Sequence, residues 1–205
     1  QEPFVNKDTG ETEMFGFNYL KTDGNYYIYE NENYIPYGFS YDYYMSRQFC
    51  ETYGKNMRTE LMLKAILLTD SQIEKYGEYM TDIEELSIGE STQTGGTAMR
   101  FTDVDMANDA AKLRQTSAKE FTVDNNGFTA RVERDKKSLV FFSVPYDKGW
   151  SATVNGKPVT VEKVNVGFMA VAVDEGESEI RFRYQNSGLV LGIVITMVSI
   201  FVFVV

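Results

Sequence analysis

Histidine is absent from the 205 residues, and cysteine occurs once, as Cys50. The missing imidazole removes the side chain that most often serves as a general base or a metal ligand. A single cysteine excludes an internal disulfide and a thiolate metal cluster. Without a histidine to activate it, Cys50 is expected to be a small apolar filler on a helix. The sequence also has no Gly-x-Ser-x-Gly motif, Walker loop or dinucleotide fingerprint, so we select no catalytic residue, metal site or cofactor.

Basic residues are also scarce, with 20 Lys and Arg against 30 Asp and Glu, which gives a net charge of −10. An acidic body disfavours nucleic acid as a partner, and no nucleic acid is expected. The first residues lack the basic start and apolar run of a signal peptide. Hydrophobic residues make up 43% of the chain, which is too apolar for a disordered protein and sufficient for one or two domains.

Charge is missing altogether from the last 18 residues, Gly188 to Val205. As a helix this run would be roughly 27 Å long, close to the hydrocarbon thickness of a bilayer. We interpret it as the start of a C-terminal transmembrane helix, cut from a longer membrane protein. The alternative is a buried hydrophobic helix or strand pair of a soluble fold, and the many β-branched residues would also tolerate strand pairing.

The first forty residues are rich in tyrosine, asparagine and glycine and are expected to form short strands. Asp23-Gly24 between apolar alternations predicts a hairpin turn. From residue 46 to about residue 117 the pattern becomes helical. Three apolar residues are predicted to share one helix face: Leu61, Ala65 and Leu68. Thr69 to Ser71 predicts an N-cap, residues 89–101 a loop, and residues 103–117 a further helix.

From Lys119 onward the apolar residues recur with a period of two, which is typical of strands. The run "SLVFFSV" is apolar on both faces and predicts a central strand, and Asn155-Gly156 predicts a type I′ hairpin turn. Ile180, Phe182 and Tyr184 are expected to point inward. Six or seven strands at this spacing predict a β-sandwich. The fold class expected is mainly β with a helical insert (α+β). The antiparallel sandwich would cover residues 1–187 with the insert at about 46–117, and the transmembrane start would cover residues 188–205.

The segment from residue 144 onward carries a recognisable set of motifs. Tyrosine, lysine, glycine and tryptophan stand at the start of a predicted strand, and an Asn-Gly-Lys hairpin follows. A Glu-Gly turn comes next, and then an aromatic strand that leads into the apolar tail. These residues are Tyr146, Lys148, Gly149, Trp150, Asn155, Gly156, Lys157, Glu175, Gly176 and Tyr184. The set resembles the C-terminal end of the YfhO family of bacterial multi-pass membrane proteins. An earlier "YIPYG", residues 34–38, is similar to the leucine-proline-leucine-glycine element of the family but departs from it at the leucines.

The resemblance implies a protein related to the GT-C glycosyltransferases, which transfer sugars from lipid-phosphate carriers to lipoteichoic acid or other envelope glycans. The catalytic carboxylate of such enzymes lies in an early extracytoplasmic loop, outside this chain. The resemblance therefore implies a non-catalytic extracytoplasmic domain at the cell membrane of a Gram-positive bacterium. Its implied partners are the membrane through Gly188–Val205, the remaining transmembrane region of the longer protein, and an envelope glycan.

Trp150, the only tryptophan, has three interpretations. Alternation places it with the inward-facing Ala152 and Val154, which favours packing between sheets. An outward-facing indole would instead be a platform for sugar stacking. The third alternative is an interface with the membrane or with neighbouring loops. The residues that we select as possible glycan contacts are Tyr26, Tyr29, Tyr34, Tyr37, Tyr146 and Trp150. The acidic clusters at residues 82–85 and 103–109 are expected to be solvated faces, because glycosidic chemistry needs two carboxylates that face each other.

The leading functional hypothesis is a domain that caps a membrane-embedded glycosyltransferase core and helps to hold the glycan acceptor. The alternative is a membrane-anchored surface module, without a transferase, that binds wall polysaccharide or a protein partner. The full-length gene distinguishes them, because many upstream hydrophobic segments favour the first and a single anchor favours the second.

Overall fold

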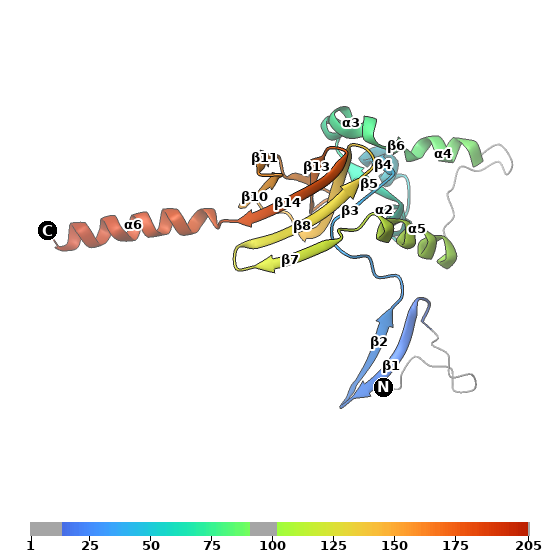
Figure 1. The fold of residues 1–205 in the computed structure, drawn as a ribbon, viewed down its shortest axis with the longest axis horizontal. Coiled ribbons are helices and arrows are strands. Elements are labelled where there is room, and N and C mark those ends of the chain that lie inside the picture. Colours follow the sequence, from blue (N-terminus) through green and yellow to red (C-terminus); the bar gives the residue numbers. More distant parts are fainter. Residues whose placement is uncertain (1–13, 91–101, 205) are drawn as a thin grey trace. The chain divides into compact units, whose positions relative to one another are not determined.

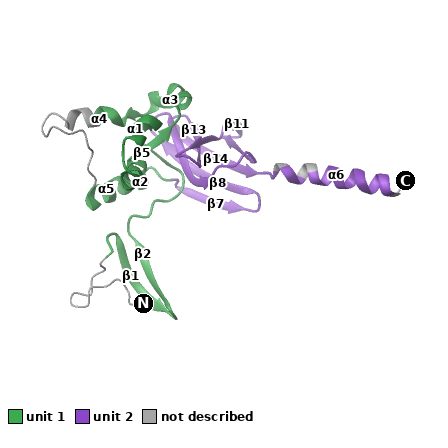
Figure 2. Ribbon diagram, turned by 180° about the vertical axis from the view of Figure 1, so that it is seen from behind, with its two compact units in different colours: residues 1–117 green, residues 118–205 purple. Residues whose placement is uncertain are grey.

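The computed structural model describes residues 14–90 and 102–204 (Figure 1). The chain forms two compact units, residues 1–117 and residues 118–205 (Figure 2). The fold is mixed α+β and strand-rich with several antiparallel sheets, which confirms the predicted class at that level. The predicted loop at residues 89–101 lies outside the described residues from residue 91 onward. The single domain predicted over residues 1–187 stays a prediction.

The predicted N-terminal hairpin is present in unit 1. β1 (Phe17–Asp23) and β2 (Tyr26–Asn31) form an antiparallel two-stranded sheet, and Gly24 takes the positive φ of 57° that the tight turn requires. The register shifts between Tyr19 and Lys21, which is the signature of a β-bulge. Among the described strands, these two pair only with each other.

Unit 1 also contains a three-stranded parallel sheet that the sequence did not predict. β4 (Tyr43–Ser46) lies between β5 (Ala65–Leu68) and β6 (Thr81–Asp82). Helices join and follow these strands. They are α1 (Arg47–Glu51), α2 (Lys55–Lys64), α3 (Asp70–Tyr76), the 3-10 turn η1 (Gly77–Tyr79) and α4 (Ile83–Glu90). The remaining elements of unit 1 are β3 (Phe39–Ser40) and α5 (Asp103–Gln115).

The sequence predicts one helix that includes Leu61, Ala65 and Leu68. This prediction is wrong beyond Lys64, because α2 ends at Lys64 and the next four residues form β5. All four residues of β5 are buried, as expected of a strand covered on both faces. Such an apolar run has no polar positions, so its periodicity does not distinguish strand from helix. The predicted cap at Thr69 is confirmed, because Thr69 and Gln72 form a capping box at the start of α3.

Unit 2 is built from eight strands and a terminal helix. The strands are β7 (Glu120–Asp124), β8 (Gly127–Arg134), β9 (Ser138–Pro145), β10 (Trp150–Val154), β11 (Lys157–Val159), β12 (Glu162–Val164), β13 (Phe168–Val173) and β14 (Gly176–Tyr184). One antiparallel sheet has the order β11-β10-β14-β8-β7, and in a second sheet β12, β13 and β9 are antiparallel neighbours.

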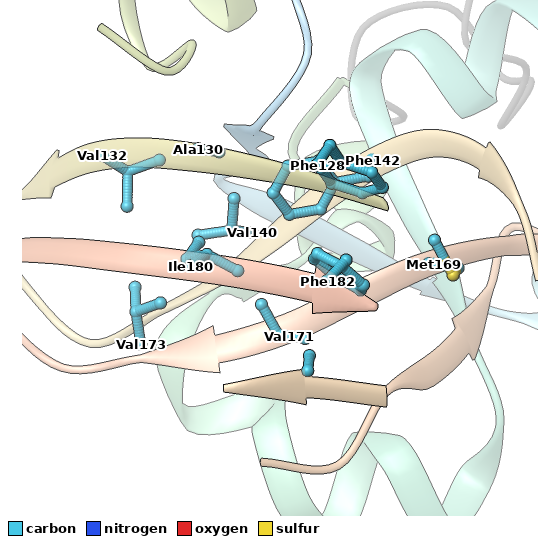
Figure 3. Packing of buried hydrophobic residues seen from close by; sticks show 11 residues of the cluster. Phe128, Ala130, Val132, Val140, Phe142, Met169, Val171, Val173, Ile180 and Phe182 are labelled. Carbon is cyan, nitrogen blue, oxygen red and sulfur yellow. The ribbon is translucent and has the colours of Figure 1, made fainter. Parts of the chain in front are cut away.

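The two sheets of unit 2 share one hydrophobic core (Figure 3). Phe128 and Phe182 from the first sheet stack with ring centroids 4.6 Å apart, and Phe142 from β9 meets Phe182 edge-on at 5.0 Å. The predicted alternation is thus correct for β8 and for β14 as far as Phe182. The predicted type I′ turn is also confirmed, since Asn155 and Gly156 have φ values of 50° and 76°.

The C-terminal apolar run is helical, as α6 (Ser187–Val204). Its described large side chains are exposed, from 53% at Val194 to 92% at Phe203. Within residues 14–90 and 102–204, no helix combines the length and apolar content needed to cross a membrane.

Candidate functional site

The turn between β9 and β10 holds the Tyr-Asp-Lys-Gly-Trp motif and is tied to the end of β14. Its Asp147 carboxylate accepts a hydrogen bond from the Gly149 amide at 2.7 Å, and the Trp150 amide donates to the Asp147 carbonyl at 3.1 Å. The Gly149 carbonyl in turn accepts from the Gln185 amide at 3.0 Å. The motif is therefore a hydrogen-bonded corner that fixes the residues immediately before α6.

Glycine is required in this corner because the chain passes too close to β14 for a side chain. A Cβ atom on Gly149 would lie 2.5 Å from the carbonyl oxygen of Gln185 and 2.9 Å from the ring of Tyr184. The first neighbour is backbone and cannot rotate away. The glycine of the motif thus has a packing explanation within unit 2.

Trp150 is partly buried and packs against the core. Its ring centroid lies 5.7 Å from that of Phe128 and 6.2 Å from that of Phe182. A third neighbour is Tyr184, at 5.0 Å. The core-packing interpretation therefore accounts for part of the indole, while its use as a sugar platform stays a prediction.

Tyr184, a ring neighbour of Trp150, and Tyr146, four positions before Trp150 in the chain, are both exposed. Tyr184, predicted to point inward, is 40% exposed, because it lies at the last position of β14, where the core ends. The negative charge of Asp147, with desolvation and a hydrogen bond between the two side chains, raises the pKa of Tyr184. Tyr146 is 36% exposed, and its amide donates to the Gly167 carbonyl at 2.7 Å.

The four tyrosines selected in the N-terminal segment belong to unit 1 and do not form one group. Tyr26 and Tyr29 are three residues apart on β2 and therefore lie on opposite faces of the hairpin. Tyr26 is 78% exposed at the turn. Tyr34 and Tyr37 follow the hairpin and are both exposed, and Arg114 of α5 donates to the Tyr34 carbonyl at 2.9 Å.

The hairpin register shows a tyrosine group that the sequence reading missed. Tyr19 lies opposite Tyr29, with ring centroids 5.7 Å apart, and Tyr27 lies on the same face two residues before Tyr29. We call Tyr19, Tyr27 and Tyr29 the tyrosine face. All three are half-buried. Reading both strands of the predicted hairpin together, rather than β2 alone, would have indicated this group.

The outer face of the larger sheet in unit 2 carries a polar groove of about 390 Å³. Arg131 of β8 lies between Glu120 at 3.3 Å and Glu179 at 3.2 Å, and Lys119 pairs with Glu133 beside them. The alternation of β8 and β14 predicts these outward positions, but nothing in the sequence indicates that they line one groove. Two cations and three carboxylates line the groove, so it offers hydrogen-bonding partners with a small negative net charge.

Several acidic residues of unit 1 have local structural roles, and Asp109, from a cluster expected to be a solvated face, is instead buried with its carboxylate 3.6 Å from the Lys64 ammonium. Asp105 closes the capping box of α5 with Thr102, whose hydrogen bonds hold the pKa of Asp105 below its usual value. At the carboxyl end of the parallel sheet, Ser46 donates to Glu84 at 3.3 Å. Among the described residues, no group of three or more His, Cys, Asp or Glu side chains is placed to hold a metal ion.

Comparison with known proteins places this chain in a family. A family model described as "Bacterial membrane protein YfhO" matches residues 90–196, about half of the chain. The chain belongs to the YfhO family of bacterial membrane proteins. The match includes the Tyr-Asp-Lys-Gly-Trp corner, the polar groove and the start of α6, and it leaves out the tyrosine face.

A relative within the YfhO family is the uncharacterized protein YfhO of Bacillus subtilis (strain 168), which is 23% identical over 95 residues. These residues make up 46% of this chain and 11% of the relative. The chain thus spans about a tenth of the length of the curated relative that it matches. No solved structure matches the chain.

Proposed function

We propose that this chain is a non-catalytic, extracytoplasmic domain of a longer YfhO-family protein that resembles GT-C glycosyltransferases. In this proposal the two-sheet core of unit 2 forms part of the β-sandwich that the sequence predicts over residues 1–187. The domain assists binding of the acceptor in envelope glycosylation, such as that of lipoteichoic acid. The observation that carries the proposal is the tyrosine face, Tyr19, Tyr27 and Tyr29.

Three half-buried tyrosines on one face of a hairpin suit carbohydrate binding. Their rings offer flat apolar surface for the CH faces of a sugar, and their hydroxyls offer hydrogen bonds. The Tyr19 hydroxyl is already oriented by the Thr22 hydroxyl at 2.6 Å. The net charge of −10 favours a neutral sugar unit over a strongly anionic stretch of polymer as the contacted part.

Several described carboxylates support a non-catalytic role, because they act as caps or in ion pairs. Glu120 and Glu179 pair with Arg131, and Asp105 caps α5. In the proposal the reacting carboxylate belongs to another part of the longer protein. The pure chain is then expected to hydrolyse and transfer no sugar, and turnover by it would contradict this role.

We further propose that α6 is the start of a membrane-spanning segment entered from the outside. Membership of a family of bacterial membrane proteins and the exposed apolar side chains of α6 support this. A full-length gene with many upstream hydrophobic segments would agree with it. A gene with one signal peptide and one anchor would instead favour a surface module that binds wall polysaccharide or a protein partner.

Binding is tested by titrating neutral oligosaccharides released from lipoteichoic acid into isotope-labelled chain and following amide chemical shifts. The matched variants are Tyr27→Ala, on the tyrosine face, and Tyr26→Ala, on the other face of the same strand. We expect Tyr27→Ala to weaken binding about fivefold, as for loss of one aromatic contact, and Tyr26→Ala to leave it within about twofold. Equal losses in both variants, or no shifts in the hairpin of the parent chain, would contradict the proposal.

A further inference from the structure

Exposed apolar side chains of the strand region of unit 2 are concentrated at one end. Within residues 118–186, five large hydrophobic side chains are 36–73% exposed: Val123, Tyr146, Val166, Phe168 and Tyr184. Partly buried Trp150 contacts the last of them. We call these six residues the aromatic rim.

The strand registers bring the aromatic rim together. Trp150 is paired with Tyr184 at the start of β10 and the end of β14. The adjacent β7–β8 turn follows Val123, and the Tyr184 amide donates to the Asn126 carbonyl at 2.7 Å. In the second sheet, Phe168 is paired with Pro145, just before Tyr146. The β7–β8 turn and the end of β14 lie at the end from which α6 leaves (Figure 1).

The opposite end of the same sheets is polar. Its three turns are Asp135-Lys136-Lys137, Asn155-Gly156 and Asp174-Glu175, and every one of these residues is exposed. Lys137 and Asp174 join two of the turns at 3.9 Å. Exposure of large apolar groups is therefore a property of one end rather than of the whole surface.

Val166, at the tip of the β12–β13 turn, has an unfavourable backbone conformation. Its φ is +69°, in the left-handed region that a β-branched residue rarely adopts, and its side chain is 62% exposed. Glycine or asparagine would fit this backbone without that strain. The left-handed backbone costs stability and the exposed valine gains no burial energy in return, which points to a contact outside unit 2.

We propose that the aromatic rim lies in the interfacial layer of a lipid bilayer. This inference rests on the proposed function in one respect, the anchoring of the chain through α6. The helix begins at Ser187, three residues after Tyr184, so an anchored α6 holds this end of unit 2 beside the membrane. The rim then supplies the second contact between the domain and the lipid.

The chemistry of the aromatic rim fits lipid headgroups better than a dry protein interface. Tyrosine and tryptophan have an apolar body and a polar tip and are enriched where hydrocarbon meets water. The exposed Lys148 and Arg183 flank them. Within residues 14–90 and 102–204, neither of these two cations forms an ion pair, so both are available for lipid phosphates.

Trp150 tests the proposal directly, because it is the only tryptophan. The full chain is reconstituted in phosphatidylcholine–phosphatidylglycerol vesicles that contain lipids brominated near the headgroup or near the bilayer centre, and recovery with floated vesicles measures attachment. We expect the shallow bromines to lower Trp150 emission about twofold and the deep bromines to have little effect. Val166→Asn with Phe168→Asn should remove most of this quenching.

The control moves the tryptophan to the polar end, as Trp150→Phe with Lys136→Trp. Its emission should respond to aqueous iodide and not to brominated lipid. If the chain floats with the vesicles but neither brominated lipid quenches Trp150, the proposed contact of the aromatic rim with lipid is refuted, while the anchoring by α6 is not. If Trp150 is quenched although α6 does not span the bilayer, the lipid contact of the aromatic rim is supported and the anchoring by α6 is refuted. Chain that stays off the vesicles refutes both.

Discussion

Gly149→Ala tests the structural explanation of the Tyr-Asp-Lys-Gly-Trp corner. The added methyl would lie 2.5 Å from the Gln185 carbonyl oxygen, where an ordinary contact needs at least about 3.4 Å, so the backbone near Gln185 must move by close to 1 Å. That shift breaks the hydrogen bond from the Gln185 amide to the Gly149 carbonyl, worth about 1 kcal/mol. Overpacking adds roughly 1–3 kcal/mol, so we expect a loss of about 2–4 kcal/mol in the free energy of unfolding.

The loss is measured by urea unfolding of the full chain in a mild detergent, followed by Trp150 fluorescence and by circular dichroism. Gly167→Ala is the matched control at the same end of unit 2. A Cβ there meets no atom within 4 Å, and its φ lies outside the left-handed region. It should change stability by less than about 0.5 kcal/mol. Equal effects of the two variants, or a Gly149→Ala chain as stable as the parent, would refute the close approach of the corner to β14.

Three further variants or conditions follow from the same structure. Trp150→Ala should cost about 2–3 kcal/mol in urea unfolding, less than the 3–5 kcal/mol typical of a fully buried tryptophan, and a loss below about 1 kcal/mol would contradict its packing on Phe128. Val166→Asn should raise the unfolding free energy by about 1 kcal/mol, since asparagine tolerates φ = +69°, and a decrease would argue against the strain. Hydrogen bonds from the Asn126 amide and from Lys119 lower the pKa values of Asp124 and Glu133, respectively. Both pKa values are lower in the folded chain than their ordinary values of 3.8 and 4.5. The two ionised carboxylates therefore stabilise the folded chain fully above pH 4.5, and this stabilisation is lost as the pH falls below 4.5. We expect the urea midpoint to fall over the same pH range. A midpoint that stays constant down to the acid transition would count against it.

The strands of unit 2 could be predicted well because each shows one exposed and one buried face. Phe128, Ala130 and Val132 alternate with polar residues, and Asn155-Gly156 supplies turn chemistry that few other sequences provide. Local caps such as Thr69 were equally accessible, because a cap depends only on residues within one turn of the helix.

The parallel sheet of unit 1 was missed for a physical reason. β5 is a run of four buried apolar residues directly after a helix, and neither length nor period marks the change at Ala65. β6 has only two residues, Thr81 and Asp82, and its strand character comes from pairing with β4 rather than from its own composition.

The sites depended on tertiary pairing that sequence alone does not supply. Tyr26 and Tyr29 were selected together, yet they face opposite sides of the hairpin, while Tyr19 joins Tyr29 only through the register. Val123 and Phe168 are 45 positions apart in the chain, and only the strand order places both at the end of unit 2 that leads to α6. Trp150 was located correctly beside the core, but its partial exposure follows from its place at the first position of β10.

The orientation of the domain is tested most directly by reporter fusions on both sides of α6 in the full-length protein. Alkaline phosphatase, which is active only outside the cytoplasm, is fused after Asn186, before the helix, and beyond the C-terminal end of the apolar run. We predict high activity for the first fusion and low activity for the second, with a cytosolic reporter giving the reverse pattern. The same side reported by both fusions would contradict an extracytoplasmic domain anchored by α6.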